Sequence, residues 1–345
     1  MQQNPSSTRA GATFIYRCLC ASIEFNSEKQ AYLKKGLMLH GYDQIGMHFR
    51  MLSDRMRMDT FQRAISNVVK PGDVVCDFGT GSGVLAMLAC RAGASKVYAI
   101  DRSNFIKTAA ELCKANGFED RITFLKTDAR TVDLPETVDV LISEWLGNAA
   151  LEENMLPPLI GLRDRVLKPA GIMLPGIVRI MAAPVRASNR FEQITFFSQP
   201  ICDLDFQGLA NPFAQERFWA HIEPEELIGE PQLVTELDMR TVSNGSLAET
   251  ITLKFAEQGL CHGVALWFDA EVAPGVSLPT GPHAARTHWR QVIFPIGPTA
   301  IEVSPGHHME VKISAHGAGS DVDWSWSIGV KTDITQDLHY SFSSI

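Results

Sequence analysis

The chain has 345 residues, of which 45% are hydrophobic and 20% charged, and its formal net charge is -8. This length supports two domains with sizeable cores, and the composition is ordinary for a soluble protein. The negative balance argues against a nucleic-acid-binding surface and is compatible with basic partners, although local charge matters more than the total. No run approaches the roughly 18 consecutive apolar residues of a membrane span, so we expect no membrane association.

The cysteines and the first residues of the chain predict a reducing compartment. The seven cysteines form no C-x-x-C pair and stand at positions 18, 20, 76, 90, 113, 202 and 261. Such an odd, scattered set is typical of reduced thiols and provides no zinc site. Residues 11–24 are mildly apolar, but Arg17 interrupts them and no clear cleavage site follows. We therefore predict a cytoplasmic protein without a signal peptide, in which residues 1–36 form a flexible tail or a short helix.

A glycine-rich turn predicts a site for a nucleotide-like cofactor. An apolar strand reaches Asp77 and runs into glycines at positions 79, 81 and 83, and residues 84–91 then have a helical pattern. Glycines remove side chains where a backbone must approach a ligand closely. A second apolar strand, residues 96–100, ends in Asp101, where an acid is expected to bind ribose hydroxyls. The pattern fits both a dinucleotide fold and an S-adenosylmethionine fold.

Two further strand ends carry polar groups. The apolar run 122–126 precedes Asp128 and Ala129, and the run 138–142 leads directly to Glu144. Strand and helix patterns alternate from about residue 72 to residue 172, which predicts a doubly wound parallel sheet that binds ligands at the carboxyl ends of its strands. Two interpretations of Asp128 stay open, contact with the adenine of the cofactor and an ordinary role as a loop residue or helix cap.

A loop after the fourth strand holds two acids that can form a guanidinium site. Glu144 and Glu153 lie nine residues apart around Gly147, so the loop must fold back on itself to bring them together. Two converging carboxylates suit a planar cation whose donors form a fork. The alternative is a solvated acidic loop. A helix near 152–167 is predicted to end at the Lys-Pro-Ala-Gly run 168–171.

The second half of the chain predicts an antiparallel β domain that resembles a barrel. Short runs with alternating apolar and polar residues indicate half-buried strands. They cover residues 179–185, 234–242, 250–256, 263–270, 292–294 and 310–315. The segment 190–225 differs, because phenylalanines and Trp219 crowd a stretch that is more helical or irregular than stranded. It is either core packing under a loop or an exposed arm that docks on a second subunit.

Three sets of residues together resemble the protein arginine N-methyltransferase family. The loop from Ser143 to Met155 is similar to the family pattern S-E-x-M-G-x-x-L-x-x-E-x-M, with Leu146 in place of the usual methionine. Residues 48–57 match H-x-x-M-L-x-D-x-x-R, and residues 287–289 are the hallmark Thr-His-Trp. The sets occur in the family's order and at its distances, over roughly residues 38–345, and jointly they are highly specific.

The resemblance implies a fold, an activity and an assembly. The fold is α/β, a doubly wound Rossmann-like methyltransferase sheet followed by a β-barrel domain with a helical dimerisation arm. Residues 37–175 are expected to bind S-adenosyl-L-methionine, and residues 176–345 to form the substrate domain with the arm at 190–225. The implied activity is methyl transfer to an arginine nitrogen by a homodimer that uses no metal.

The resemblance also implies roles for single residues. Glu144 and Glu153 would clamp the substrate guanidinium and aim one terminal nitrogen at the sulfonium methyl. His288 would pair with Asp54 for orientation and electrostatics rather than for obligatory proton abstraction, and Arg57 would pair with the cofactor's carboxylate. The other residues expected at the cofactor are His48, Met51, Asp77, Gly79, Gly81, Gly83, Asp101, Asp128 and Ala129. Those expected at the acceptor are Tyr42, Met155 and Trp289, and Met51 also borders that pocket.

Two departures from the family leave the acceptor open. Family enzymes usually carry Y-F-x-x-Y on a helix that closes over the cofactor, whereas Met38–Tyr42 keeps only the second tyrosine. Gly41 also weakens a helix there by roughly 1 kcal/mol relative to alanine. Arg130 stands where the family commonly has a glutamate near the adenine. The acceptor is therefore arginine within a protein, or free arginine or a related small guanidine.

Two other functions are weighed against arginine methylation. A non-catalytic scaffold that binds the cofactor is disfavoured, because both glutamates, Arg57 and the Thr-His-Trp segment are intact. A nucleic-acid methyltransferase is disfavoured because the D/N-P-P-Y/F motif for base amines is absent from the fourth strand end, where Ser-Glu-Trp-Leu stands.

Overall fold

The computed structural model describes residues 41–319, 321–331 and 338–343. The predicted tail at residues 1–36 lies outside these residues, as does the first part of the Met38–Tyr42 segment. The described chain begins with a short 3-10 helix, η1 (Gly41–Asp43), followed by α2 (Ile45–Ser53) and α3 (Arg55–Val68).

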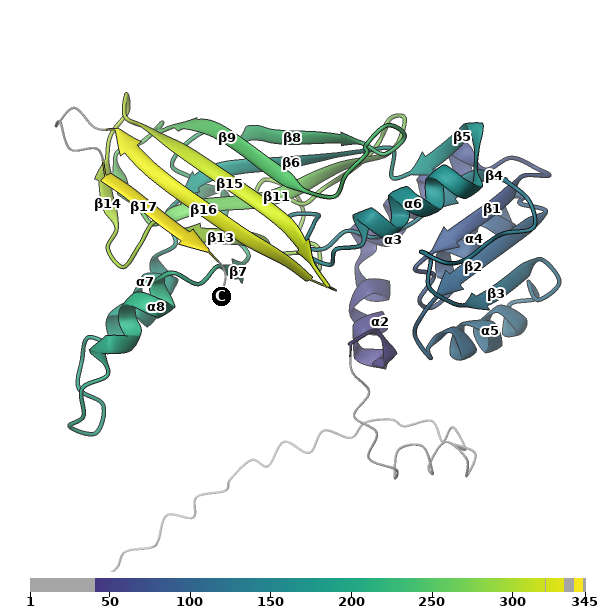
Figure 1. The fold of residues 1–345 in the computed structure, drawn as a ribbon, viewed down its shortest axis with the longest axis horizontal. Coiled ribbons are helices and arrows are strands. Elements are labelled where there is room, and N and C mark those ends of the chain that lie inside the picture. Colours follow the sequence, from purple (N-terminus) through teal and green to yellow (C-terminus); the bar gives the residue numbers. More distant parts are fainter. Residues whose placement is uncertain (1–40, 320, 332–337, 344–345) are drawn as a thin grey trace, which may run out of the picture. The chain divides into compact units, whose positions relative to one another are not determined.

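A five-stranded parallel sheet forms the first region, in the order β3-β2-β1-β4-β5 (Figure 1). Its strands are β1 (Val74–Phe78), β2 (Lys96–Asp101), β3 (Ile122–Lys126), β4 (Val138–Ile142) and β5 (Leu167–Leu174). β1 and β4 are buried almost throughout, as strands covered on both faces are. The strand order reverses between β1 and β4, and open α/β sheets bind ligands at that point. The predicted Rossmann-like sheet is confirmed.

Three helices connect strands of this sheet, namely α4 (Val84–Ala92), α5 (Ile106–Ala115) and α6 (Leu156–Val166). The helix α3, which precedes the sheet, links the two regions of the fold. The side chain of Asp54 accepts a hydrogen bond from the Arg57 amide and caps the first turn of α3. Phe61, Ala64 and Ile65 form the fully buried face of this helix. α3 packs against α4 and β5 of the parallel region and against β11 and β12 of the antiparallel region.

The second region consists of antiparallel sheets. A six-stranded sheet has the order β7-β13-β11-β6-β8 with β12 on β11, a four-stranded sheet has the order β17-β16-β15-β9, and β10 pairs with β14. The strands are β6 (Ile177–Val185), β7 (Phe218–Ala220), β8 (Gln232–Asp238), β9 (Leu247–Lys254), β10 (Gly259–Cys261), β11 (Gly263–Ala273), β12 (Val276–Pro279), β13 (Gln291–Pro295), β14 (Ile301–Val303), β15 (His308–Ala318), β16 (Asp321–Lys331) and β17 (Leu338–Ser343).

Aromatic side chains join the two larger sheets. Phe294 of β13 lies 5.2 Å from Trp324 and 5.1 Å from Trp326 between ring centroids, and both tryptophans belong to β16. The indole nitrogen of Trp326 donates to the Pro295 carbonyl. The two sheets therefore share one core, and the predicted antiparallel domain is confirmed. Closure of these sheets into a barrel stays a prediction.

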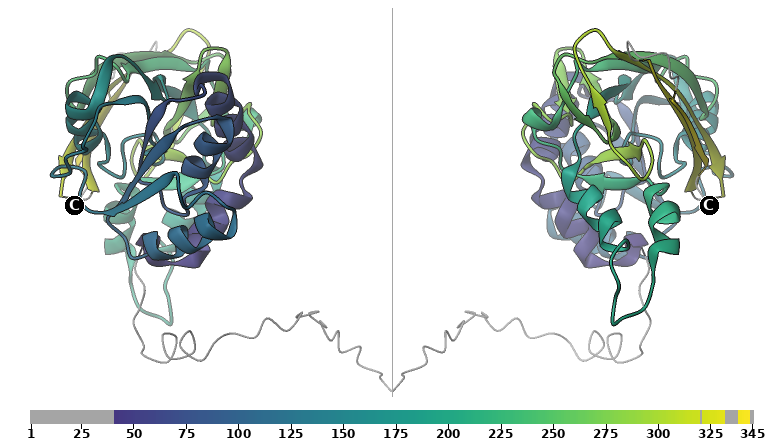
Figure 2. Two further views of the ribbon diagram at one scale, coloured as in Figure 1. Left: turned by 90° about the vertical axis from the view of Figure 1, so that its right-hand side faces the viewer. Right: turned by 90° about the vertical axis from the view of Figure 1, so that its left-hand side faces the viewer.

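The segment predicted as an arm contains two helices, α7 (Ser188–Phe196) and α8 (Ala210–Ala214), and the 3-10 turn η2 (Gln207–Leu209). Figures 1 and 2 show α7 and α8 side by side, extending away from the antiparallel sheets. A small core of Ile194, Ala210 and Ala214, with Phe197 and Phe213 packed against it, holds them together. Phe196 and Leu204 are instead 56% and 60% exposed. Part of the aromatic segment therefore packs into a small core and part is exposed, and docking of the arm on a second subunit stays a prediction.

Several predicted boundaries were wrong. The helix expected near 152–167 begins only at Leu156, because residues 143–155 form the acid loop. The Lys-Pro-Ala-Gly run 168–171 does not stop a helix but lies within β5. The strand predictions at 234–242 and 250–256 extend past the ends of β8 and β9. The eleven-residue strand β16 was missed.

Candidate active site

The glycine-rich turn lies between β1 and α4, where close packing excludes side chains. Gly79 has φ 74° and Gly81 has φ 51°, in the left-handed region that residues with a Cβ rarely adopt. A Cβ on Gly81 would lie 3.2 Å from Cε1 of His48, which belongs to α2. The amides of Gly79 and Thr80 both donate to the Ile100 carbonyl of β2. The turn therefore depends on its glycines and on the neighbouring strand.

Two carboxylates hold this turn in place. Oδ2 of Asp77 accepts from the Thr80 hydroxyl at 2.6 Å and from the Ala86 amide at 3.1 Å. Oδ2 of Asp101 accepts from the Gly81 amide at 2.8 Å. Burial raises the pKa of Asp77 to about 7, against the hydrogen bonds that favour its ionised form. Oδ1 of Asp77 is buried without a hydrogen-bond partner among the described residues, so a donor from a bound ligand would satisfy it.

His48 connects α2 to the glycine-rich turn. Its ring stacks on Phe105 with 3.6 Å between the ring centroids, and its Nε2 lies 2.8 Å from the Tyr42 carbonyl. Burial lowers the pKa of His48, although the Tyr42 carbonyl and Asp101 act in the opposite direction. The structure thus places His48 against the turn as predicted for a residue of the cofactor site, and its direct contact with a cofactor stays a prediction.

Glu144 follows β4 and forms a buried ion pair with α3. Arg57 donates to Oε2 of Glu144 from Nε at 2.9 Å and from Nη2 at 2.8 Å, and both side chains are 7% exposed. Nη1 of Arg57 donates to the Met51 carbonyl, and Oε1 of Glu144 accepts from the Leu146 amide. Arg57 therefore fixes one acid of the loop. The contact predicted between Arg57 and the cofactor's carboxylate stays a prediction.

Glu153, the second acid of the loop, contacts Tyr42 and is affected by the charge of Glu144. The Tyr42 hydroxyl donates to Oε1 of Glu153 at 2.5 Å. Burial raises the pKa of Glu153 to about 7, with the charges of Glu144 and Glu152 adding to the rise and the Tyr42 hydrogen bond opposing it. Burial also raises the pKa of Tyr42, and Glu153 and Glu144 add to this effect. Both acids thus act on Tyr42, and the three side chains lie close enough to influence one another.

The loop folds back between the two acids. Gly147 and Ala150 exchange backbone hydrogen bonds of 3.0 Å in both directions. Ala149 and Ala150 have φ values of 46° and 66°, which is a strained conformation for alanine. A Cβ on Gly147 would lie 3.1 Å from Cβ of Glu152, so a larger residue there would require the loop to shift. The predicted reversal of the loop is confirmed.

Residues far along the chain hold the reversed loop. The indole nitrogen of Trp289 donates to the Leu146 carbonyl at 2.6 Å, and the Arg290 amide donates to Oδ1 of Asn148 at 2.8 Å. Trp289 is 3% exposed and packs on Phe268 with 5.1 Å between the ring centroids. The geometry makes Trp289 a support for the loop, and its direct contact with an acceptor stays a prediction.

Asp54 and His288 form the predicted pair across the two regions. Oδ2 of Asp54 lies 2.8 Å from Nδ1 of His288 and accepts from the His288 amide at 2.7 Å. Burial opposes ionisation of Asp54, but the hydrogen bonds from His288 and from the Arg57 amide outweigh it and lower the pKa of Asp54. The pair therefore joins the start of α3 to the segment before β13.

Comparison with known proteins places these features in a family. The family model described as "Arginine methyltransferase oligomerization subdomain" matches residues 178–328, and that of "Ribosomal protein L11 methyltransferase (PrmA)" matches residues 61–201. Protein arginine N-methyltransferase PRMT10 of Arabidopsis thaliana is 32% identical over 298 residues, which are 76% of this chain and 77% of the relative. The chain belongs to the protein arginine N-methyltransferase family.

Other relatives and solved structures agree with this assignment. Probable protein arginine N-methyltransferase 6 of Arabidopsis thaliana is 33% identical over 251 residues, or 70% of this chain, and the chain spans 57% of that relative's length. The structure of Arabidopsis thaliana protein arginine methyltransferase 10 matches with a TM-score of 0.75 at 28% identity, covering 88% and 98% of the two chains. A chain of the Trypanosoma brucei PRMT1 enzyme-prozyme heterotetrameric complex with AdoHcy matches in fold, with a TM-score of 0.82 at 24% identity over 88% and 99%.

Glu152 is a residue of this methyltransferase's acid loop whose contacts the sequence did not predict. Both carboxylate oxygens of Glu152 accept from the indole nitrogen of Trp219, at 3.0 and 2.9 Å, and Arg217 lies 3.8 Å from Oε1. Burial raises the pKa of Glu152, while Trp219 and Arg217 oppose the rise. The doublet Glu152-Glu153 was visible in the sequence, but nothing local indicated that residues near the end of the 190–225 segment would contact it.

The remaining predicted residues lie around the two halves of the site. A Cβ on Gly79 would lie 3.8 Å from Cε of Met155, so the acid loop reaches the glycine-rich turn. Asp128 forms an ion pair with Arg130 at 2.6 Å, and this pairing lowers the pKa of Asp128 to about 2. The Ala129 carbonyl accepts from Arg165. The adenine contacts of Asp128 and Ala129 therefore stay predictions.

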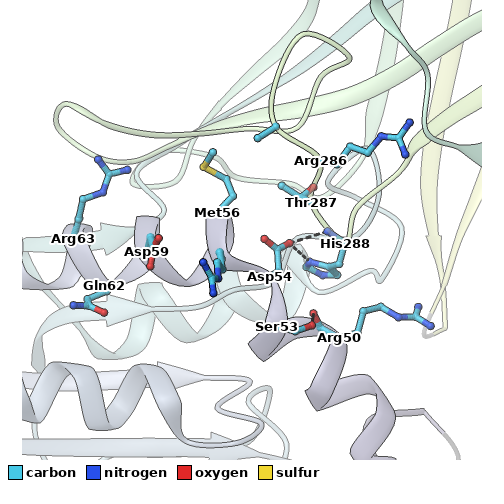
Figure 3. A pocket seen from close by; sticks show the side chains of 12 residues that line it. Arg50, Ser53, Asp54, Met56, Asp59, Gln62, Arg63, Arg286, Thr287 and His288 are labelled. Carbon is cyan, nitrogen blue, oxygen red and sulfur yellow. Dashed lines mark hydrogen bonds and ion pairs between the residues drawn. The ribbon is translucent and has the colours of Figure 1, made fainter. Parts of the chain in front are cut away.

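A cavity of about 900 Å³ opens beside the Asp54–His288 pair, between α2, α3 and residues 285–288 (Figure 3). Glu144 and Glu153 do not line it. Among the described residues, no three side chains of the kinds that ligate metals gather in one place. Within that same part of the chain, no helix is both long and apolar enough to cross a membrane.

Proposed function

We propose that Glu144 and Glu153 clamp an arginine guanidinium while the chain transfers a methyl group to it from S-adenosylmethionine. The observation that carries this proposal is the arrangement of two acids at the end of β4, where the buried Arg57 side chain pairs with Glu144 and the more exposed Tyr42 donates to Glu153. Guanidinium presents planar, forked donors that match carboxylates. Arg57 already occupies Oε2 of Glu144, so a substrate guanidinium would complete the charge balance of two acids and one arginine.

The residues at β1 and β2 are suited to the cofactor. Gly79 and Gly81 allow the backbone to approach it, Asp101 stands at the end of β2, and the buried Oδ1 of Asp77 is available to a donor. When bound, S-adenosylmethionine supplies a methyl group on a positively charged sulfur. Met155 lies against Gly79 and so brings the acid loop next to this cofactor site. Cofactor and acceptor would then meet between the glycine-rich turn and the acid loop.

Placement accounts for most of the expected rate. A guanidinium held by two fixed carboxylates presents one terminal nitrogen in a defined direction. Such orientation lowers the entropic part of the activation barrier, because the reacting groups are already aligned when the acceptor is bound. The guanidinium nitrogen would attack the methyl carbon, so that a carbon–nitrogen bond forms while the carbon–sulfur bond breaks with its electron pair going to sulfur. The nitrogen would then lose one proton. Glu153, whose pKa is raised to about 7, is suited to accept it. Asp54 orients His288 and thereby ties the antiparallel region to the start of α3.

Arginine within a protein is the acceptor that we propose, in preference to free arginine. The names of the relatives support it, since they are protein arginine N-methyltransferases. A transfer assay with radiolabelled S-adenosylmethionine tests the choice by offering an arginine-glycine-rich peptide and free L-arginine in parallel. Label in the peptide supports the proposal, and label in free arginine alone contradicts it. Label in neither, with measurable cofactor binding, favours the scaffold.

We further propose that two copies of this chain form a homodimer in which each arm packs on α2 of the other copy. Ile45, Phe49 and Leu52 are 72%, 71% and 42% exposed and share one face of α2 at helical spacing. Exposed apolar side chains that gather in this way mark interaction sites. Phe196 and Leu204 offer a second such surface on the arm, and the matched oligomerisation subdomain includes it.

Light scattering tests the homodimer. Leu204→Glu places a charge on the exposed arm and should give monomers. Leu233→Glu is a matched control, because Leu233 is 48% exposed on β8, outside the arm, and should leave the dimer intact. A dimer that persists in Leu204→Glu, or that is lost equally in both variants, contradicts the role of the arm.

A cytoplasmic location is also part of the proposal. The thiols of Cys76, Cys90, Cys113 and Cys261 are free and buried, which supports folding in a reducing environment. Burial raises the pKa of the Cys90 thiol to about 11, so it is a poor nucleophile. Cell fractionation of the tagged chain tests the location.

A further inference from the structure

The cavity beside the Asp54–His288 pair gathers arginines in a chain whose formal net charge is -8. They come from α2, from α3 and from the segment before β13. Figure 3 shows Arg63 at one end of the cavity and Arg50 and Arg286 at the other. The four arginines that line the cavity are Arg50, Arg55, Arg63 and Arg286. Two acids among the described residues, Asp54 and Asp59, line it as well, so positive charge is in excess.

Three of these arginines are available to a ligand. Within the described ranges, Arg50, Arg55 and Arg63 form no ion pair, whereas Arg286 pairs with Glu223. The carboxylate of Asp54 is already satisfied by His288 and by the Arg57 amide. The cavity therefore contains exposed guanidinium groups that outnumber the carboxylates available to pair with them. Because this excess lies in one cavity, it differs from charges scattered over a solvated surface.

The cavity lies next to the acceptor site. Arg55 and Arg57 are two residues apart at the start of α3, where Arg55 lines the cavity and Arg57 holds Glu144. His288 lines the cavity and belongs to the segment whose Trp289 supports the acid loop.

We propose that this cavity binds an acidic segment of the substrate protein close to its target arginine. The inference rests on the proposed methylation of protein arginine and adds a rule of substrate choice to it. Arginine forks bind carboxylates in a bidentate manner, and Met56 and Thr287 offer contacts to side-chain stems. A nucleic acid fits less well, because a long polyanion would extend beyond the cavity over the rest of a chain whose formal net charge is -8, whereas a short acidic segment would not.

A binding experiment on the full-length chain tests the proposal. Two fluorescent peptides share one Gly-Arg-Gly target and differ only in a flank of Asp and Glu residues or of the matching Asn and Gln residues. Anisotropy should show about tenfold tighter binding of the acidic peptide at low salt, since each exposed charge pair contributes up to about fivefold. The difference should shrink as salt rises.

Substitutions locate the effect. The double variant Arg55→Gln/Arg63→Gln should reduce the preference for the acidic peptide to about twofold or less. Arg91→Gln removes an exposed arginine from α4, outside the cavity, and should keep the preference. Equal affinity for both peptides, failure of both to bind, or the same loss in Arg91→Gln overturns the proposal. A single-stranded oligonucleotide that binds more tightly than the acidic peptide and depends on Arg55 and Arg63 also overturns it.

Transfer assays on the same samples separate this proposal from the function on which it rests. A chain that prefers the acidic peptide in binding but methylates neither peptide keeps the cavity site and contradicts the methyl transfer. A chain that methylates both peptides equally and binds them equally contradicts the cavity site alone. Light scattering of the double variant should show the same oligomeric state as the unmodified chain. A change in that state would assign the arginines to the subunit interface instead and overturn the proposal.

Discussion

The glycine-rich turn and the acid loop meet in one site, but the chain builds them in different ways. The turn is held by partners close in sequence, since Asp77 bonds Thr80 and Ala86 and Asp101 bonds Gly81. The acid loop is held from outside its own region, because Trp289 bonds Leu146 across 143 positions of the chain. The first structure is complete within the parallel sheet, and the second depends on the antiparallel sheets.

This difference separates the two halves of the proposed reaction. Changes at the turn should affect the cofactor, and changes at the loop or its distant supports should affect the acceptor. Met155 is where the halves touch, since it reaches Gly79 from the acid loop. Substitutions on either side of this contact can show whether the division is real.

The largest effect is expected at the acids themselves. Glu153→Gln keeps the size of the side chain but removes the charge that we propose to bind guanidinium, as Glu144→Gln does for its partner. Loss of one partner from a desolvated charge pair costs about 3–4 kcal/mol, so kcat/KM should fall roughly 100- to 1000-fold. Calorimetry should show nearly unchanged cofactor affinity. An equal loss of cofactor binding would move these acids out of the acceptor pocket.

A smaller and opposite effect is expected at Asp101. Asp101→Ala removes an anionic acceptor from the end of β2 and the bond that fixes the Gly81 amide. A hydrogen bond to a charged group contributes about 1.5–3 kcal/mol, so the Kd for S-adenosylmethionine should rise roughly 10- to 100-fold. At saturating cofactor, the KM for the acceptor should remain close to that of the unmodified chain. Unchanged cofactor affinity would contradict the assignment of Asp101.

The distant support of the loop gives a third test. Trp289→Phe keeps an aromatic ring in the core but removes the donor to the Leu146 carbonyl. The acid loop should therefore be less well positioned, while the fold should keep its stability. A lost hydrogen bond in the core costs about 1–2 kcal/mol, which predicts about a tenfold lower kcat at unchanged cofactor affinity. Trp326→Phe makes the same chemical change at the Pro295 carbonyl, away from the loop. Similar losses of kcat in both variants would mean that Trp289 acts through stability alone.

The same division explains what the sequence predicts. The turn could be read in advance because its strand, glycines, helix and second acid follow one another within residues 74–101. The reversal of the acid loop was inferred from chemistry, as the only way to bring Glu144 and Glu153 together. The support from Trp219 to Glu152 could not be predicted, since it depends on where the end of the 190–225 segment lies in the fold.

Boundaries failed for a similar reason. The proline and glycine in the run 168–171 are local stop signals for a helix, but pairing of β5 with β4 overrides them, with Ile172 opposite Val140. β16 alternates buried apolar residues such as Trp324 and Trp326 with polar ones, which is a strand pattern that was overlooked. Local signals thus fail where pairing between strands decides the structure.

The smallest effect is expected in the pH dependence of the acceptor half. Glu153 must be ionised to bind a guanidinium, and its pKa is raised to about 7, so kcat/KM should fall about tenfold between pH 8 and pH 6 as the carboxylate is protonated.

Glu152 adds to the rise in the pKa of Glu153 through its charge, whereas burial is the larger cause. Glu152→Gln should therefore move the inflection to lower pH by less than about one unit. Glu119→Gln, an exposed acid after α5, should leave the inflection in place. Loss of the contact between residue 152 and Trp219 should lower the maximal kcat/KM without moving the inflection of the pH profile. The pH profile therefore separates the charge of Glu152 from its structural role. An inflection that stays near pH 7 in Glu152→Gln and disappears in Glu153→Gln would leave burial as the main control of the acceptor acid.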